Sequence, residues 1–76
     1  MPSKIPRISG EDAIKAFCKA GFRLDRIRGS HHILRHSEKR SRLSIPIHKG
    51  HTVGVGLLRS QIFAAGMTVD EFIGFL

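Results

Sequence analysis

The pair Gly29-Ser30 restricts the fold of this chain more than any other feature, because it separates two short stretches with strand-like composition. Glycine adopts positive φ values at little cost, so a two-residue loop that begins with glycine suits a tight antiparallel hairpin. We therefore expect two neighbouring strands, over residues 22–28 and 31–37.

A third strand is indicated by alternation over residues 42–48. Leu43, Ile45 and Ile47 fall on one face, which is typical of an antiparallel strand with one buried side. Pro46 has no N–H group to donate to a neighbouring strand, so we expect this strand either to lie at an edge of the sheet or to have an unpaired side at Pro46.

A helix is predicted over about residues 9–20. Ser9 and Asp12 have the spacing of a capping box, in which the serine hydroxyl accepts a hydrogen bond from a free amide of the first turn. Gly21 suits the left-handed conformation that often follows a helix. The apolar residues of this helix recur on one side and are expected to face the core: Ala13, Ile14, Phe17 and Cys18. We expect Cys18 to be a small buried residue.

Two further helices are predicted after a glycine-rich loop over residues 49–56. One runs from residue 56 or 57 to Ala65, and a short terminal helix begins at Thr68, which forms a second capping-box pattern with Glu71. We expect one side of the longer helix to face the core, through Leu58, Ile62 and Ala65. We also expect the five phenylalanines to lie in the core: Phe17, Phe22, Phe63, Phe72 and Phe75.

The resulting order, α-β-β-β-α followed by a short helix, separates helices from strands along the chain. This order is typical of a two-layer α+β domain. We expect a single domain over residues 1–76, with residues 1–8 as a lead-in segment. A domain of this size buries only about 60% of the surface that its unfolded chain exposes, so we expect a shallow functional site.

Basic residues are concentrated in the strand region. The formal net charge of the chain is +7, and between residues 22 and 51 the lysines and arginines far outnumber Asp25 and Glu38. Such a cluster is typical of a domain that binds nucleic acid or another polyanion. Its members are Arg23, Arg26, Arg28, Arg35, Lys39, Arg40, Arg42 and Lys49.

The sequence also limits the compartment and the cofactors. A single cysteine cannot form a disulfide within the chain, which favours a reducing compartment. There is no run of ~20 apolar residues and no signal-peptide pattern, so we expect a cytoplasmic protein with no membrane partner. The histidines match no zinc motif, and we expect no metal and no other cofactor.

His31 and its neighbour His32 are the candidate catalytic residues. Histidine exchanges a proton near neutral pH and arginine binds phosphate, so a histidine among arginines suggests acid–base cleavage of a phosphate backbone, for which RNA is best suited. Alternation places the neighbouring His32 on the opposite face of its strand, and leaves open which face is buried. We expect nearby residues to contact the RNA: Arg26, Arg28, Ser30, Arg35 and His48. His48 is also a candidate second proton carrier.

Six segments, in their order and spacing, resemble the HicA family of small toxins from toxin–antitoxin pairs, also described as mRNA interferases. They are Gly21-Phe22, Gly29-Ser30-His31-His32, Ile45-Pro46-Ile47-His48, Gly56-Leu57-Leu58-Arg59, Ala65-Gly66-Met67-Thr68 and Glu71-Phe72. The resemblance implies a fold like that of a double-stranded-RNA-binding domain, with a three-stranded sheet packed on two helices. It also implies cleavage of mRNA that depends on the histidine of the Gly-Ser-His motif, which is His31 in this chain, and a HicB-type antitoxin that covers the site.

The leading hypothesis is therefore a metal-independent endoribonuclease toxin in which His31 transfers protons. Two other functions fit the same residues. A non-catalytic RNA-binding module would bind RNA by shape and show salt-sensitive binding without cleavage. A protein-interaction domain would have no affinity for RNA at physiological salt.

Overall fold

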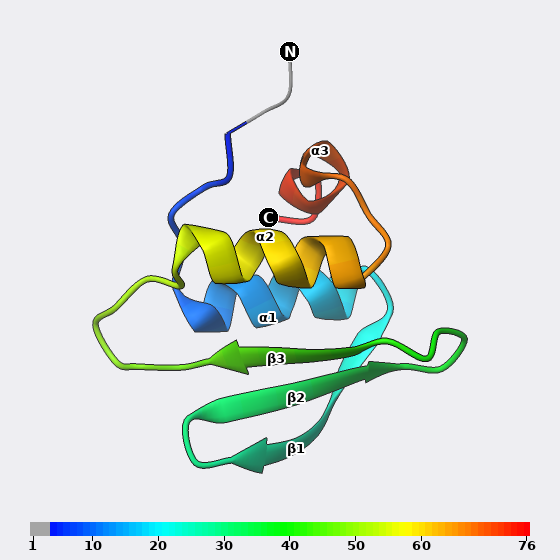
Figure 1. The fold of residues 1–76 in the computed structure, drawn as a ribbon, viewed down its shortest axis with the longest axis horizontal. Helices are drawn as coiled ribbons and strands as arrows, with labels where there is room; N and C mark the ends of the chain where they lie inside the picture. Colours follow the sequence, from blue (N-terminus) through cyan, green and yellow to red (C-terminus); the bar gives the residue numbers. More distant parts are fainter. Residues whose placement is uncertain (1–3) are drawn as a thin grey trace.

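The computed structural model of the protein describes residues 4–76 and shows a three-stranded antiparallel sheet with helices on one side (Figure 1). The first three residues of the expected lead-in segment lie outside the described residues. The elements are α1 (Gly10–Lys19), β1 (Phe22–Arg28), β2 (His31–His36), β3 (Arg42–Pro46), α2 (Val55–Ala64) and α3 (Val69–Ile73). The α+β class and the order α-β-β-β-α are thus confirmed.

The sheet has the order β1-β2-β3, which places β3 at an edge, as Pro46 predicts. The hairpin loop has a φ of +59° at Gly29, and Ser30 has no positive φ, which is the arrangement of a type II′ turn. On the far side of β3 the N–H group of Ser44 donates a hydrogen bond to Oε1 of Gln61 in α2, at 2.9 Å. The helix thus satisfies one amide of the sheet edge.

Burial decides which face of β2 packs against the helices. Leu34 is completely buried, whereas its neighbour Arg35 is exposed. Because successive side chains alternate, His32 shares the helix side with Leu34, and His31 lies on the side that faces away from the helices. We call this second side the outer face of the sheet.

Strand β1 contains a β-bulge at Asp25. Leu24 pairs with Leu34, and Arg26 pairs with the next residue of β2, Ile33, so Asp25 is an extra residue in the register. Residues that pair across neighbouring strands share a face of the sheet. The bulge therefore brings the arginines before and after it onto the same outer face: Arg23, Arg26 and Arg28.

The core lies between the sheet and the helices. Helix α1 contacts β1 and β3, α2 contacts β3, and α3 packs against α1 and α2. The ring of Phe17 lies 4.9 Å from that of Phe72 and 6.1 Å from that of Phe22, measured between centroids. The buried set also includes the expected stripe of the second helix and one residue of the lead-in segment: Leu58, Ile62, Ala65 and Ile5.

Two residues expected in the core lie at the surface instead. Cys18 is exposed, and Phe63 is 84% exposed. Successive helical residues differ by about 100° around the axis, and each of these residues follows a buried one, Phe17 or Ile62. Each helix buries one stripe only, so the apolar neighbour at its edge turns toward solvent.

The start of α1 packs directly on the end of β3. Gly10 is buried there, and a Cβ atom at this position would lie 2.6 Å from the carbonyl oxygen of Pro46. The side chain of Ser9 caps the helix by accepting a hydrogen bond from the N–H group of Asp12, at 3.1 Å. The close packing of Gly10 on Pro46 holds the helix layer close to the end of the sheet that carries the hairpin loop.

Candidate nucleic-acid interface

His31 is the first residue of the central strand, and its side chain is exposed on the outer face. It pairs with Arg28 of β1 and with Pro46 of β3. Side chains opposite one another in antiparallel strands have Cβ atoms about 5 Å apart. The hairpin therefore places a histidine and an arginine side by side, both open to a ligand, at one end of the sheet.

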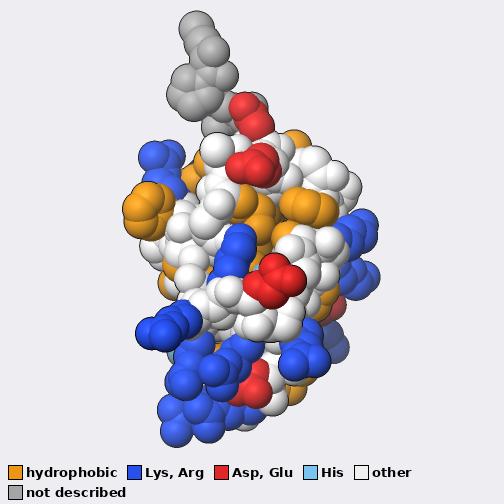
Figure 2. Space-filling view, turned by 90° about the vertical axis from the view of Figure 1, so that its right-hand side faces the viewer, with side chains coloured by type: hydrophobic (Ala, Val, Ile, Leu, Met, Phe, Trp, Pro, Cys, Tyr) orange, Lys and Arg blue, Asp and Glu red, His pale blue; other side chains and the backbone are white. Residues whose placement is uncertain are grey.

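Five arginines share the outer face with His31. Arg26 pairs with Ile33, and Arg35 pairs with one arginine on each neighbouring strand. Lysine and arginine side chains crowd the lower part of the molecule in Figure 2, where the sheet lies. The five residues are Arg23, Arg26, Arg28, Arg35 and Arg42, and all are exposed.

The acidic side chain nearest to these arginines in the sequence is that of Asp25 in the bulge. One of its carboxylate oxygens, Oδ2, lies 3.7 Å from Nε of Arg26. Both side chains are largely open to water, so this ion pair is screened and contributes little to stability. The outer face therefore remains strongly positive.

The structure also brings Ser30 and His48 to the end of the sheet where His31 lies. The carbonyl group of Ser30 accepts a hydrogen bond from the N–H group of Ile47, at 2.8 Å. His48 follows directly and is exposed. It lies beyond β3, which ends at Pro46, two residues earlier than expected.

His32 has different surroundings from His31. Its ring is half-buried on the helix side of β2, and Nδ1 lies 3.4 Å from the carbonyl oxygen of Ser30. When Nδ1 carries the proton, this contact is a hydrogen bond that ties the ring to the hairpin loop. His32 is thus placed to support the loop, and not to meet a ligand on the outer face.

The other histidine of β2 is also held by its neighbours. The N–H group of Glu38 donates a hydrogen bond to Nδ1 of His36, at 3.0 Å, and the ring of His36 lies edge-on to that of Phe22.

Within residues 4–76, no group of three or more histidine, cysteine, aspartate or glutamate side chains is placed to hold a metal ion. The same residues form no helix that is long and apolar enough to cross a membrane.

Arg23 and Arg42 belong to the basic region of the sequence, but they are not among the RNA contacts expected from it. For Arg42 the signal was present, since it precedes the buried Leu43 in an alternating strand. For Arg23 the signal was the spacing of the apolar residues in β1. Phe22 and Leu24 are two residues apart, whereas Leu24 and Ile27 are three apart, which indicates one extra residue in the strand.

The fold and this surface together define a small α+β protein whose sheet presents an exposed histidine among arginines. A family model described as the HicA toxin of bacterial toxin–antitoxin matches residues 10–67, and the chain belongs to this family. It is therefore the toxin of a toxin–antitoxin system, with a cognate antitoxin as its partner. Comparison with curated proteins gives no match.

Proposed function

We propose that the protein is an endoribonuclease that cleaves mRNA by acid–base catalysis at His31, without a metal ion. The observation that carries this proposal is the exposure of His31 on the outer face, beside Arg28. The resemblance to the HicA mRNA interferases also supports it, and the family match agrees with that resemblance. We further propose that the protein acts in the cytoplasm and that its antitoxin is of the HicB type and covers His31.

The reaction needs two proton transfers. A base removes the proton of a ribose 2′-hydroxyl, whose oxygen attacks the adjacent phosphorus, and an acid protonates the 5′-oxygen as it leaves. The products are a 2′,3′-cyclic phosphate end and a 5′-hydroxyl end. His31 in its neutral form acts as the base, and His48 is the candidate for the acid. Because the attacking group is the 2′-hydroxyl, DNA is not a substrate.

The arginines supply the positive charge that this reaction needs. The phosphate gains negative charge as the 2′-oxygen attacks, and Arg28, about 5 Å from His31 between Cβ atoms, is placed to stabilise it. Arg26 and Arg35 lie farther along the same face and bind the RNA backbone, together with Ser30 in the loop. This charge compensation is one role that a bound metal ion has in other nucleases.

The substitution His31→Ala tests the proposal. We expect cleavage of RNA to slow by at least about 10²-fold, the contribution of a well-placed acid or base, while a 2′-O-methyl RNA still binds. His51→Ala is the matched control, since this histidine is exposed in the loop before α2. Cleavage is followed by the appearance of 2′,3′-cyclic phosphate ends, in the presence and absence of EDTA.

Full cleavage by a folded His31→Ala protein would overturn the assignment of His31. Loss of activity in EDTA would overturn metal independence. If the wild-type protein binds RNA in a salt-sensitive manner but makes no cyclic phosphate ends, the protein is a non-catalytic RNA-binding module instead.

A further inference from the structure

Three arginines form a row across the sheet at the end of β2 opposite to His31. Arg35 pairs with Arg23 on β1 and with Arg42 on β3, so the three side chains lie next to one another on the outer face. We call these residues the arginine row. Like charges directly opposite in a sheet are destabilising. The acidic residue of β1, Asp25, forms its ion pair with Arg26 and leaves this repulsion in place.

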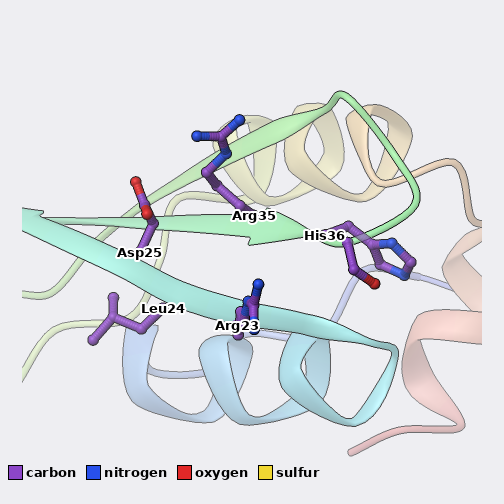
Figure 3. A pocket seen from close by; sticks show the side chains of 6 residues that line it. Arg23, Leu24, Asp25, Arg35 and His36 are labelled. Carbon is purple, nitrogen blue, oxygen red and sulfur yellow. The ribbon is translucent and has the colours of Figure 1, made fainter.

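Two residues of the arginine row, Arg23 and Arg35, line a shallow depression of about 520 Å³ on the surface of β1 and β2. In Figure 3 the side chain of Asp25 points toward β2, whereas Leu24 points away from it. The depression is lined by Arg23, Leu24, Asp25, Arg35, His36 and Ser37. Its walls therefore provide guanidinium groups and a hydroxyl as hydrogen-bond donors, together with one carboxylate.

This depression is separate from the candidate catalytic end of the sheet. Arg35 follows His31 by four residues on the same strand, which corresponds to about 13 Å at the rise of an extended strand. A group held at the arginine row is therefore too far from His31 to be the phosphate that reacts there.

We propose that the arginine row is a second phosphate-binding site, which holds the RNA backbone at a phosphate other than the one cleaved. The proposal rests on the proposed function and adds where the rest of the substrate lies. Neighbouring strands are about 4.8 Å apart, so two adjacent guanidinium groups can contact one phosphate. Their planar donor pairs match the oxygen atoms of a phosphate better than an ammonium group does.

The residue types on the outer face favour this ligand. The five cations there are all arginines, whereas the lysines among the described residues lie outside the strands. RNA that runs along β2 from His31 meets Arg26 and then the arginine row, so its successive phosphates stay near positive charge. Binding two separate phosphates fixes the position of the chain relative to His31.

Asp25 provides an independent test of the same site. Its carboxylate lines the depression and would repel a phosphate bound there. In the free protein it compensates part of the positive charge through Arg26. Replacement by Asn removes the negative charge with little change in shape, so we expect Asp25→Asn to bind RNA more tightly than the wild type.

The main experiment measures binding of a labelled 2′-O-methyl RNA oligonucleotide to the full chain at several salt concentrations. This RNA cannot be cleaved, so binding is measured separately from the proposed catalysis. The row variant carries Arg23→Gln, Arg35→Gln and Arg42→Gln. The control carries Lys15→Gln, Lys19→Gln and Arg59→Gln, three cations of α1 and α2, and has the same net charge.

We expect the row variant to bind about tenfold more weakly or worse. The slope of its log–log salt dependence should fall by about 0.7 for each phosphate that the variant no longer binds. The control should stay within about threefold of the wild type, because its cations lie off the outer face. With cleavable RNA, the row variant should show a raised KM and a kcat close to that of the wild type. Thermal melting of both variants confirms that they are folded.

Three outcomes would overturn the proposal. Equal weakening in the row variant and the control would show that affinity reflects net charge alone. A large loss of kcat at saturating RNA would place the row at the reacting phosphate. Unchanged RNA binding with loss of binding to a polyglutamate peptide would assign the surface to an acidic protein. If the wild type cleaves no RNA at all, the proposed function fails, and the binding comparison still decides the role of the row.

Discussion

At the scale of single residues, His31 and His32 are adjacent histidines in different environments. His31 is exposed on the outer face, whereas His32 is half-buried beside the carbonyl group of Ser30. The difference follows from the alternation of side chains along a strand. Phe63 and Phe72 show the same dependence on position, because the first is 84% exposed and the second is completely buried.

The contrast between these two phenylalanines can be measured. We expect Phe63→Ala to change the free energy of unfolding by no more than about 0.5 kcal/mol, as is usual at exposed sites. Phe72→Ala removes a ring that packs 4.9 Å from that of Phe17, and should cost about 3–5 kcal/mol. Urea unfolding of both variants checks this, and a larger loss for Phe63→Ala than for Phe72→Ala would contradict the packing described above.

At the scale of elements, the bulge of β1 is an insertion into an otherwise regular strand. With Asp25 left out, the remaining residues alternate without interruption, so that Phe22, Leu24 and Ile27 lie on the helix side. The arginines between them then lie on the outer face. The bulge therefore adds a carboxylate to the outer face without moving the core residues.

Deletion of Asp25 should for this reason preserve the fold. The shortened strand keeps every side chain on its present face, and the deletion relieves the bulge. Deletion of Ile33 from β2 is the control, because β2 has no bulge and the loss of one residue would turn one end of the strand over. Circular dichroism and urea unfolding should show a cooperative transition for the first deletion and an unfolded chain for the second. An unfolded chain after deletion of Asp25 would show that the bulge is required for the fold.

At the scale of the whole molecule, one face of the sheet packs against the helices and the other is open to a ligand. The helices bury Leu34 of β2 and Leu43 and Ile45 of β3 completely, while Leu24 and Ile27 of the edge strand β1 remain 47% and 54% exposed. None of the helices in residues 4–76 lies over the outer face, which carries the arginines (Figures 1 and 2). A domain of this size can thus build a core and still leave a full sheet surface for a ligand.

This arrangement predicts that anions stabilise the protein. The chain has a net charge of +7, and its crowded arginines repel one another in the folded state. Salt screens this repulsion, and sulfate should also bind the arginine row and raise stability by mass action. We expect Tm to rise with sodium chloride, and to rise further with sodium sulfate at equal ionic strength. A gain of about 1 kcal/mol corresponds to roughly 4–8 °C for a domain of this size.

Differential scanning calorimetry of the wild type and the row variant checks this prediction. The extra effect of sulfate over chloride should be smaller in the row variant, because the binding site is absent. A Tm that does not respond to either salt would show that repulsion on the outer face is too weak to matter.

Much of the candidate site could be predicted from the sequence because its signals are local. The hairpin depends on Gly29-Ser30, and the separation of His31 from His32 depends on alternation within one strand. The arginine row could not be predicted in this way, since it joins residues from three strands. The exposure of Cys18 was missed because an apolar pattern marks the side of a helix but not the width of its buried stripe.

The sequence by itself determined the order of the elements, their caps and the hairpin, because turn chemistry and side-chain periodicity act between near neighbours. Only the tertiary structure decided which face of β2 is buried, where the bulge shifts the register of β1, and which arginines meet on the outer face. These features depend on strand pairing and on the area that the helices cover, which are set by contacts between residues far apart in the chain. The exposed position of His31 depends on both: alternation within β2 separates it from His32, and the packing of the helices decides which of the two faces outward.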